Sequence, residues 1–454
     1  MKALTAQELA AIIGATWVAG DAAAWADAGV CTDTRKLVPG CVFFALKGDH
    51  FDANVFASQA LQQGAAVVVV SQWSGTAAQG GAVLLVPDTL AALQTLAAWW
   101  RAQLDLHVIG LTGSNGKTST KDFTAAVLSR KYATCATRGN LNNHIGLPLT
   151  VLETGDAHQA AVYEMGMNHA GEIAPLAAIA RPQICIITNI GSSHIEFLGT
   201  RENIAREKAS IASLLTENET LIVPYDCDFL PIIRSLTRAR VMSTGGENDE
   251  VRAIEVREDE GHMKFLLVCG DDSAQVDLPV AGRHMVANAL LAAAAGSLCG
   301  ISVEQIAHGL GQARLTSGRL HRFVGRGITV FDDTYNANPE SMMAGLHTLA
   351  AQPTAEGGRR FAVLGRMGEL GEHAADGGRR VGLCAAELDL IVVTVGDEAD
   401  LISMHAGPTA KHFACRDEAA NFLSAELRAG DVVLFKGSRT AAMERVMKQI
   451  FPND

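Results

Sequence analysis

The stretch Gly113-Ser114-Asn115-Gly116-Lys117-Thr118-Ser119 decides the fold of the middle part of this chain. It follows an apolar run, His107 to Thr112, and precedes a helix-like segment, Lys121 to Arg130. A strand, a glycine turn, a lysine, a hydroxyl residue and a helix, in this order, are the context of a phosphate-binding loop. The glycines let the backbone turn tightly and point N–H groups at an anion, and the helix N-terminus adds partial positive charge. The stretch therefore predicts that the chain binds ATP or GTP.

Two side chains of this loop have candidate roles in the chemistry. Lys117 can reach the terminal phosphates, and the Thr118 hydroxyl can bind the accompanying Mg²⁺. The usual pattern has a glycine about five positions before the Gly-Lys pair, but this chain has Leu111 there. A glycine-rich turn with a surface lysine is the alternative interpretation. A phosphate loop indicates a bound nucleotide and not a reaction, so the reaction has to be inferred from the rest of the chain.

The composition of the chain limits its class. Its 454 residues are enough for about two to four domains, and 48% apolar residues suffice for buried sheets. The formal net charge of −12 argues against a protein that binds nucleic acid or an anionic membrane, because such proteins carry basic surfaces. The nine cysteines form no Cys-x-x-Cys pair, and no apolar run approaches the length of a membrane span. We therefore expect a soluble, cytoplasmic protein without a signal peptide.

The rhythm of apolar and helical segments predicts an α/β chain of three domains. Residues 1–86 read as a small α/β N-terminal domain, from which a strong helix, Leu90 to Leu104, leads onward. Residues 87–314 predict a central parallel sheet covered on both faces, with an antiparallel annex. Residues 315–454 predict a smaller, Rossmann-like domain. The expected strands are His107–Thr112, Ala133–Thr137, Ala160–Met165, Ile184–Ile190 and Thr220–Pro224 in the centre, and Ile328–Asp332, Phe361–Gly365, Leu390–Val395, His412–Cys415 and Val432–Lys436 in the third domain.

Polar side chains follow several of the central strands. Glu164 lies at the end of one strand, and His194 follows the next strand on a Gly/Ser loop. Because the carboxyl ends of parallel strands form the ligand crevice, Glu164 is a candidate Mg²⁺ ligand, and His194 could bind metal or a phosphoryl oxygen. A salt-bridged or capping glutamate and an ordinary loop histidine are the alternatives. Lys208 lies on a helix that can return toward this crevice, but by itself it reads as a solvated partner of Glu207.

Amide side chains mark further candidates in the central domain. Asn142 and Asn143 belong to an amide-rich run, Gly139 to His144, which suits either recognition of peptide or sugar groups or a turn. Asn288 lies four residues after His284 at a helix start. Its paired donor and acceptor can match an adenine edge, and capping is the alternative.

The third domain contributes acidic, amide and basic groups at strand ends. The stretch Asp332 to Pro339 holds two acids and two amides, which favours a nucleotide or sugar site. Arg319 lies on the interdomain hinge, and an arginine delivered across a cleft can neutralise a transferring phosphate. The run Lys436-Gly437-Ser438-Arg439 offers two cations and a hydroxyl that fit a carboxylate.

Taken together, these stretches resemble the Mur ligases, a family of ATP-dependent amide-forming enzymes of peptidoglycan precursor synthesis. The loop without its first glycine, Thr112 to Thr118, is that family's form. The resemblance covers all three domains and is specific to the branch that adds D-alanyl-D-alanine to UDP-N-acetylmuramoyl-tripeptide. The Asp-Asn-Pro-Arg stretch of the diaminopimelate-adding relative is absent. The other stretches that carry the resemblance are Thr32–Lys36, Phe44–Gly48, Gly139–Gly146, Glu164–His169, Asp332–Pro339 and Lys436–Arg439.

The resemblance implies ATP and two Mg²⁺ ions as cofactors. Lys117 would contact the phosphates, Thr118 and Glu164 would bind one Mg²⁺, and His194 would bind the second. In this family the lysine that matches Lys208 is commonly carbamylated, which would make it a carboxylate-like Mg²⁺ ligand. The implied catalytic residues are Lys117, Glu164, His194 and Lys208.

The resemblance also implies where the substrates bind. The first domain would hold the uridine diphosphate part, and the third would bring the dipeptide to a nucleotide held by the second. We expect a monomer that acts on these small molecules and binds neither nucleic acid nor a membrane. The implied nucleotide contacts are Gly113, Ser114, Asn115, Gly116, Lys117, Thr118, Ser119, Asn288, Arg319 and Asp333, and the implied contacts to the other substrates are Thr34, Arg35, Lys47, Asn142, Asn143, Tyr335, Asn336, Lys436, Ser438 and Arg439.

The implied reaction passes the γ-phosphoryl group of ATP to the free carboxylate of the tripeptide. The dipeptide amine then attacks the acyl phosphate, and the tetrahedral intermediate collapses to an amide and phosphate. Closure of the third domain would exclude water that could hydrolyse the acyl phosphate.

Three stretches depart from the family pattern. Phe51 to Phe56 lacks the usual glycine–histidine–aspartate, which affects the expected contacts to uridine diphosphate. Arg366 stands where an aspartate is usual, in the stretch Gly365 to Gly371. Ala374 to Arg380 has two glycines where a histidine-containing helix is usual, so we expect unusual geometry in that part of the third domain.

Two other classes of protein share part of these features. A sister Mur ligase or a folylpolyglutamate-type synthetase would share the loop, Glu164 and His194, but not the stretch Tyr335 to Pro339. A phosphate-loop regulator without ligase activity would need the loop alone, and it gives no account of Lys436 to Arg439.

Overall fold

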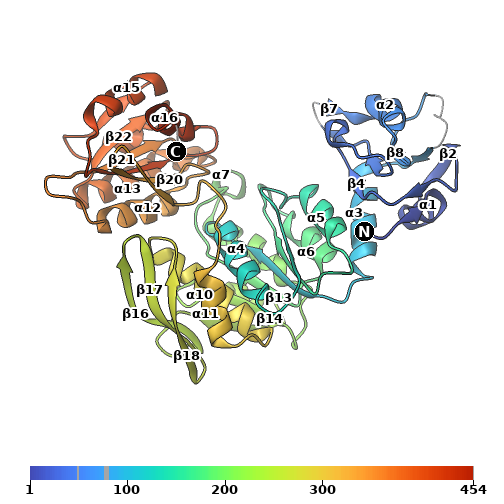
Figure 1. The fold of residues 1–454 in the computed structure, drawn as a ribbon, viewed down its shortest axis with the longest axis horizontal. Helices are drawn as coiled ribbons and strands as arrows, with labels where there is room; N and C mark the ends of the chain where they lie inside the picture. Colours follow the sequence, from blue (N-terminus) through green and yellow to red (C-terminus); the bar gives the residue numbers. More distant parts are fainter. Residues whose placement is uncertain (49–50, 76–80, 453–454) are drawn as a thin grey trace. The chain divides into compact units, whose positions relative to one another are not determined.

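The computed structural model describes residues 1–48, 51–75 and 81–452 (Figure 1). The chain divides into two compact units. The first unit contains Met1–Gly110, Tyr132–Met167 and Glu172–Gln183. The second contains Leu111–Lys131, Asn168–Gly171 and Ile184–Asp454. Within the described ranges, no helix has both the length and the apolar character needed to cross a membrane.

The N-terminal segment is built on a five-stranded sheet. Its core is apolar: the four valines of β8 (Val67–Val70) are fully buried, as are Phe44 and Leu84 in neighbouring strands. The sequence does not predict β2, β3 or β4, because β2 exposes residues such as Trp17 and because β3 and β4 have two residues each. The strand order is β2 (Thr16–Gly20), β9 (Ala82–Leu85), β8, β5 (Val42–Phe44) and β4 (Val30–Cys31), with β2–β9 antiparallel and the other pairs parallel. The remaining elements are β1 (Leu4–Thr5) with β3 (Trp25–Ala26), β6 (Lys47–Gly48) with β7 (Phe51–Asp52), α1 (Ala6–Ile13) and α2 (Ala57–Gln62).

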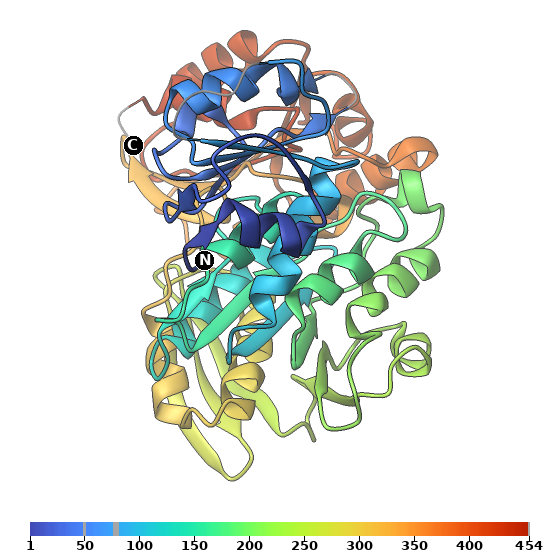
Figure 2. The same ribbon diagram turned by 90° about the vertical axis from the view of Figure 1, so that its right-hand side faces the viewer.

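Helix α3 (Thr89–Arg101), drawn in light blue in Figure 2, follows this segment. It begins at Asp88, whose carboxylate accepts hydrogen bonds from the N–H groups of Leu90 and Ala91. This contact satisfies two donors that a helix start leaves open. The predicted helix is therefore confirmed, although it ends at Arg101 and not at Leu104.

The central sheet is parallel, as the sequence predicts. The pairs β11–β12, β13–β14 and β14–β15 all run parallel. The sequence does not predict β15, in which polar Arg240, Ser243 and Thr244 interrupt the apolar pattern. The strand order is β11 (Thr134–Ala136), β12 (Ala160–Glu164), β10 (His107–Thr112), β13 (Ile184–Ile187), β14 (Thr220–Pro224) and β15 (Arg240–Thr244). Its helices are α4 (Lys117–Leu128), α5 (Gly146–Glu153), α6 (Ile173–Ala180), α7 (Ile195–Leu198), α8 (Arg201–Ala209) and α9 (Leu230–Ser235).

The antiparallel annex predicted after the central sheet is present. Strands β16 (Val251–Asp259), β17 (His262–Cys269) and β18 (Asp272–Leu278) form a three-stranded antiparallel sheet. Helix α10 (Arg283–Leu298) follows and buries its alanine-rich middle, and α11 (Val303–Gly311) begins with a capping box at Ser302.

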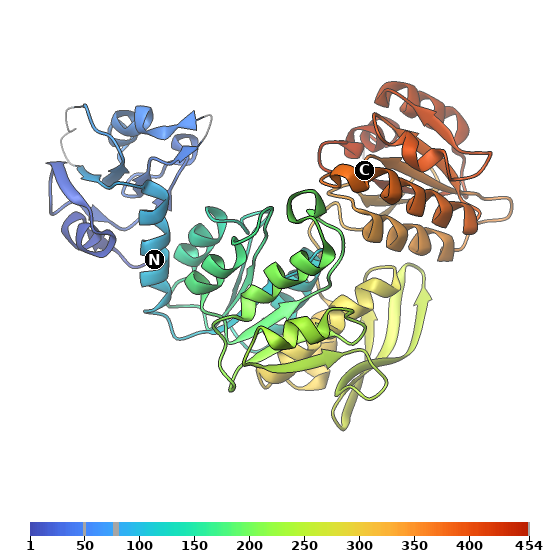
Figure 3. The same cartoon turned by 180° about the vertical axis from the view of Figure 1, so that it is seen from behind.

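The C-terminal segment has a Rossmann-like sheet with helices over its faces (Figure 3). Its core joins valines of β21, β22 and β24 to apolar residues of α15 and α16. The antiparallel edge strand β19, which is largely exposed, is not predicted. The strand order is β19 (His321–Gly325), β20 (Ile328–Asp333), β24 (Val432–Lys436), β21 (Arg360–Gly365), β22 (Ile391–Val395) and β23 (Lys411–Phe413), parallel except for β19. Its helices are α12 (Pro339–Ala351), α13 (Ala374–Glu387), α14 (Asp400–Ser403), α15 (Arg416–Glu426) and α16 (Met443–Ile450).

The expectation of unusual geometry between Ala374 and Arg380 is wrong, because the regular helix α13 covers this stretch. A Cβ atom on Gly378 would lie 2.6 Å from the Leu401 Cβ atom, and one on Gly382 would lie 2.4 Å from the Ile402 carbonyl oxygen. The glycines therefore let α13 pack closely on α14. This packing offsets the low helix propensity of glycine, which is about 1 kcal/mol per residue.

Candidate active site

The phosphate loop between β10 and α4 needs glycine at two positions. A Cβ atom on Gly113 would lie 1.8 Å from the Thr188 Oγ1 atom. Gly116 has a φ of 76°, and a Cβ atom there would lie 2.5 Å from the Asn288 Oδ1 atom. Leu111, which stands where the longer pattern has glycine, is fully buried inside β10. The loop therefore begins only after Thr112, and the apolar residue at 111 belongs to the strand.

The segment after β13 holds this loop in place. The Ser114 N–H donates to the Asn189 carbonyl (3.0 Å), and the Gly191 N–H donates to the Ser114 hydroxyl (2.8 Å). The Thr188 hydroxyl donates to the Asn115 carbonyl at 2.5 Å. These partners lie more than 70 positions apart in sequence, so the tertiary fold keeps the loop ordered.

Two lysines meet at one carbonyl of the loop. The ammonium groups of Lys117 and Lys208 donate to the Gly113 carbonyl oxygen at 2.7 and 3.0 Å. Lys208 is 1% exposed, and burial, reinforced by the charge of Lys117, holds its pKa well below the ordinary value. Two cations this close repel each other unless an anion joins them. The arrangement therefore suits a polyphosphate at this position.

Glu164 is the last residue of β12 in the first unit, and its two carboxylate oxygens differ in their hydrogen bonding. Its Oε1 accepts a hydrogen bond from the Asn142 amide (2.8 Å), and its backbone N–H donates to the Thr137 hydroxyl (2.9 Å). Its Oε2 is buried and has no hydrogen-bond partner among the described residues. A buried carboxylate oxygen without a donor is satisfied by a cation, so this residue fits the predicted role of Mg²⁺ ligand.

The two amides predicted beside it have different roles in the structure. Asn142 supports Glu164 through the contact described above. The Asn143 side chain accepts hydrogen bonds from the N–H groups of Ile145 (3.2 Å) and Gly146 (2.9 Å). Asn143 therefore forms the turn into α5, which was the alternative interpretation for this run.

His194 precedes α7 and is mostly buried, with 13% of its side chain exposed. Its Nδ1 atom lies 2.5 Å from the Glu369 Oε2 atom, at an angle outside that of a hydrogen bond. Burial lowers the His194 pKa, and the Glu369 carboxylate opposes that shift. Within the described part of the chain, no three His, Cys, Asp or Glu residues form a metal cluster. A metal here would therefore complete its shell with hydroxyl and phosphate oxygens, as Mg²⁺ commonly does.

The three other nucleotide candidates lie in the second unit with the loop. The Arg319 guanidinium donates to the Thr118 hydroxyl (3.1 Å) and lies over the Tyr335 ring, 4.1 Å from its centroid. Asn288 is 6% exposed and packs against Gly116. Asp333 accepts from the Lys436 ammonium at 2.6 Å. The structure thus brings Arg319 and Asn288 to the loop, whereas the Asp333 carboxylate is engaged within its own segment.

The candidates for the uridine diphosphate lie on short elements of the first unit. Arg35 is 87% exposed, and its guanidinium forms a forked contact with Asp33, with distances of 2.9 and 2.7 Å. Thr34 begins the same 3-10 turn, which Asp33 caps. Lys47 lies 3.7 Å from Asp52 across the β6–β7 pair. Their charges are therefore matched locally and remain accessible.

The predicted substrate-binding residues of the C-terminal segment form more internal contacts than the sequence indicates. The Lys436 ammonium is buried and donates to both Asp333 and the Asn336 carbonyl (3.1 Å). Ser438 is buried beside Thr440, whereas Arg439 is 71% exposed and lies 3.4 Å from Glu444. Tyr335 stacks under Arg319, as described above. Lys436 thus holds the stretch at 332–336 together, and Arg439 is the accessible cation of this run.

Three residues that reach the central loops are not predicted as site residues. The Asn338 amide donates to the Asn115 side chain (2.7 Å) and to the Ser193 hydroxyl. The Glu340 carboxylate accepts from the Ser192 hydroxyl (2.8 Å), and Glu369 lies against His194. Each partner lies far away in sequence, so no local pattern reports the contact. The motifs Asp332 to Pro339 and Gly365 to Gly371 were the available signals.

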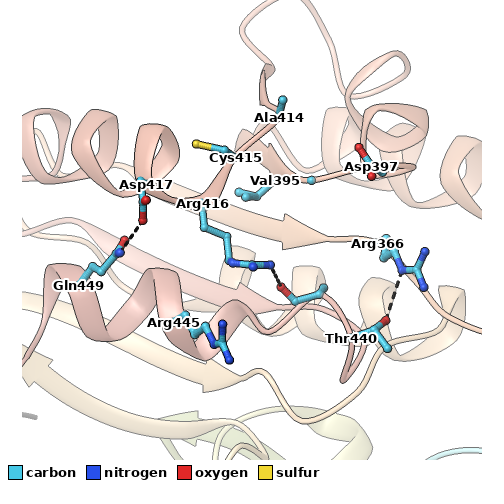
Figure 4. Close-up of a pocket in the computed structure, with 12 residues that line it drawn as sticks. Arg366, Val395, Asp397, Ala414, Cys415, Arg416, Asp417, Thr440, Arg445 and Gln449 are labelled. Carbon is cyan, nitrogen blue, oxygen red and sulfur yellow. Dashed lines mark hydrogen bonds between the residues drawn. The ribbon is translucent and has the colours of Figure 1, made fainter.

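A cavity of about 640 Å³ opens at the carboxyl ends of the C-terminal strands (Figure 4). Arg366, which follows β21, donates to the Thr440 hydroxyl (3.3 Å), and Arg416 donates to a carbonyl of the loop after β24 (3.1 Å). Arg445 and two acidic residues, Asp397 and Asp417, also line it. Three guanidinium groups face two carboxylates in this lining, which suits a small anion.

Two family models match the chain. The Mur ligase middle domain matches residues 111–296, and the Mur ligase, glutamate ligase domain matches residues 318–439. The chain is 38% identical over 432 residues to the UDP-N-acetylmuramoyl-tripeptide–D-alanyl-D-alanine ligase of Escherichia coli (strain K12), with 93% of this chain and 94% of the relative covered. It is 37% identical to the enzyme of the same name from Bacillus subtilis (strain 168), with 93% of each covered.

Solved structures agree with these relatives. Crystal structure I of MurF from Acinetobacter baumannii matches with a TM-score of 0.92 at 36% identity and 99% coverage of both chains. The MurF ligase of Thermotoga maritima in complex with ADP matches with a TM-score of 0.84 at 28% identity, covering 93% of this chain and 96% of that one. The folylpolyglutamate synthase of Mycobacterium tuberculosis, at 18% identity and a TM-score of 0.64, shares the fold alone.

Proposed function

The chain belongs to the Mur ligase family, and from this premise we propose that it joins D-alanyl-D-alanine to UDP-N-acetylmuramoyl-tripeptide. The products are UDP-N-acetylmuramoyl-pentapeptide, ADP and phosphate, within peptidoglycan precursor synthesis. Curated relatives that carry this activity in their names are 37% and 38% identical over 93% of the chain. The observation that carries the proposal is the anchored phosphate loop, with two lysines on the Gly113 carbonyl and Arg319 on Thr118.

The side chains around the loop suit phosphoryl transfer to a carboxylate. Lys117 can turn from the Gly113 carbonyl to a phosphate oxygen and offset charge as the γ-phosphoryl group moves. Arg319, held over Tyr335, presents a second cation from the C-terminal segment. The loop N–H groups and the start of α4 bind the remaining phosphate oxygens. The acyl phosphate then reacts with the dipeptide amine.

We assign the Mg²⁺ ligands as Thr118, Glu164, His194 and a carbamylated Lys208, for two ions. Bound Mg²⁺ supplies charge neutralisation and positioning of the phosphates. Two observations support this set: the orphan Glu164 Oε2 atom and the lowered pKa of Lys208. Addition of CO₂ to lysine requires the neutral amine and releases one proton, so a buried lysine with a lowered pKa is suited to carbamylation.

The remaining substrate groups are assigned by domain, with boundaries at residues 86 and 314. The first domain, 1–86, holds the uridine diphosphate through Thr34, Arg35 and Lys47, whose accessible charges support this role. The central domain, 87–314, holds ATP. The third, 315–454, presents the dipeptide, whose carboxylate pairs with Arg439 and with Arg366 of the adjoining cavity. We further propose that the enzyme is a cytoplasmic monomer.

Phosphate release from ATP tests this proposal. With UDP-N-acetylmuramoyl-tripeptide present, we expect release only after D-alanyl-D-alanine is added, together with formation of the pentapeptide product by mass spectrometry. Release that depends on glutamate or diaminopimelate instead would indicate a sister ligase. Release that needs no amino-acid substrate, or none under any condition, would contradict the proposal.

A further inference from the structure

A loop of the C-terminal segment is held against the start of α7 by several contacts. The Glu369 carboxylate lies 2.5 Å from His194 Nδ1, and the Glu369 carbonyl accepts a hydrogen bond from the Glu196 N–H (3.3 Å). Gly371 has a φ of 52°, and a Cβ atom there would lie 3.0 Å from the Glu196 Cγ atom, so this close approach favours glycine. The loop position is therefore fixed by backbone as well as side-chain contacts.

The backbone conformations of His194 and Glu369 bring their two side chains together. His194 and Glu369 both have positive φ angles, 64° and 60°, which are uncommon for residues other than glycine. Such conformations persist where the surrounding structure requires them. With Nδ1 facing Glu369, the other ring nitrogen, Nε2, is the atom that His194 can offer to a metal ion or a phosphoryl oxygen.

We propose that Glu369 is a positioning residue, whose carboxylate forms a close charged contact with His194 Nδ1 and leaves Nε2 for the phosphoryl-transfer site. A carboxylate beside one nitrogen of an imidazole restricts the orientation of the ring and raises its basicity as a ligand. This inference rests on the proposed function of His194. It adds that the C-terminal segment supplies the group that completes the His194 site.

The charges around Glu369 agree with this role. Its carboxylate lies close to Lys117 and His169 as well as to His194. Positive or protonatable groups on several sides therefore suit an acidic side chain at this place. Because 41% of the Glu369 side chain is exposed, its replacement leaves no cavity, and the backbone contact to Glu196 remains.

The consequence is a coupling between placement of the C-terminal loop and readiness of the His194 site. When the loop rests on α7, the imidazole is oriented; when it does not, the ring can rotate. The site would thus be completed only in molecules whose third domain has docked on the central one, which would limit ATP hydrolysis before the dipeptide arrives.

The test compares Glu369→Gln and Glu369→Asp with a control, Glu372→Gln, in the full-length protein. Glu372 lies on the next turn and is 91% exposed, with a contact of 3.9 Å to His373. We expect Glu369→Gln to raise the Mg²⁺ concentration for half-maximal rate by about tenfold or more, while ADP binding without Mg²⁺ stays unchanged. Glu369→Asp should recover part of the loss, and the control should match the unmodified protein.

A readout independent of turnover is the environment of the His194 ring nitrogens. Long-range ¹H–¹⁵N spectra of histidine-labelled protein, with His194 assigned by its loss in His194→Gln, should show ring nitrogen signals that Glu369→Gln shifts. An unchanged His194 signal together with an unchanged Mg²⁺ dependence would overturn the inference. Because the spectra need no substrate, they test Glu369 even if the phosphate-release assay contradicts the proposed reaction.

Discussion

Two buried lysines of the second unit differ in what surrounds them. Lys436, 2% exposed, meets the Asp333 carboxylate at 2.6 Å and forms a complete ion pair. Lys208, 1% exposed, meets the Gly113 carbonyl and a second cation, Lys117. The buried pair needs no further partner, whereas Lys208 forms no salt bridge among the described residues, and such a site suits a ligand or a modification. From this difference we infer that Lys436 is structural, and we propose that Lys208 is functional.

The largest effect expected from this comparison is on turnover. Lys117→Ala should lower the rate of phosphate release by about a thousandfold or more, because it removes the cation nearest the transferring group. The melting temperature should stay near that of the unmodified protein, since the Lys117 side chain is only partly buried. Lys448→Ala, at an exposed position of α16, is the control. An active Lys117→Ala enzyme would show that the loop is structural.

The next largest effect is on the stability of the protein, and it distinguishes Lys436 from Lys208. Lys436→Met should lower the free energy of unfolding of the C-terminal segment by about 3–5 kcal/mol, because it leaves the mostly buried Asp333 carboxylate without its cation. Urea denaturation measures this loss. The double variant Lys436→Met/Asp333→Asn should recover part of it, and equal instability of the single and double variants would contradict the pairing.

The pH dependence of the free energy of unfolding also distinguishes Lys208 from Lys436. Burial lowers the Lys208 pKa in the folded protein, whereas the unfolded chain keeps the ordinary value of about 10.4. Between these two values the unfolded state binds more protons, so the free energy of unfolding rises with pH, by at most about 1.4 kcal/mol per unit. Urea unfolding in CO₂-free buffer should show this rise, and Lys208→Met should lack it. Parallel pH profiles would mean that Lys208 remains charged.

The smallest effect is the stability of Lys208→Met itself. Lys208 forms no salt bridge with any residue that the structure describes, and methionine is an apolar side chain of similar length. We therefore expect a change within about 1 kcal/mol, or a gain. Turnover should nevertheless be lost. A destabilisation as large as that of Lys436→Met would show that Lys208 is a structural residue.

Much of the fold follows from apolar runs in the sequence. The strands β10, β14 and β24 have the predicted bounds, because each is a run of mostly buried residues. Strands β2, β15 and β19 are not predicted, since exposed or polar residues break their pattern. Helix α13 shows the opposite error, because close packing permits a helix that local propensity opposes.

The candidate site divides in the same way. The phosphate loop, Glu164 and His194 are predicted because each occupies a recognisable place at a strand end. Asn338, Glu340 and Glu369 are not, because they act on the central loops through partners more than 140 positions away in sequence. The engagement of Lys436 with Asp333 is likewise a property of two strands that meet only in the folded sheet.

The position of β24 in the sheet has a consequence for folding during synthesis of the chain. This strand pairs with β20 on one side and β21 on the other, although β20 to β23 all precede it in the chain. A nascent chain on the ribosome therefore presents two facing strand edges without their shared partner until residues 432–436 have emerged. Open edges of this kind recruit other strands. A stalled or truncated translation product that stops before Val432 would be a substrate for chaperones and proteases rather than a partly active ligase.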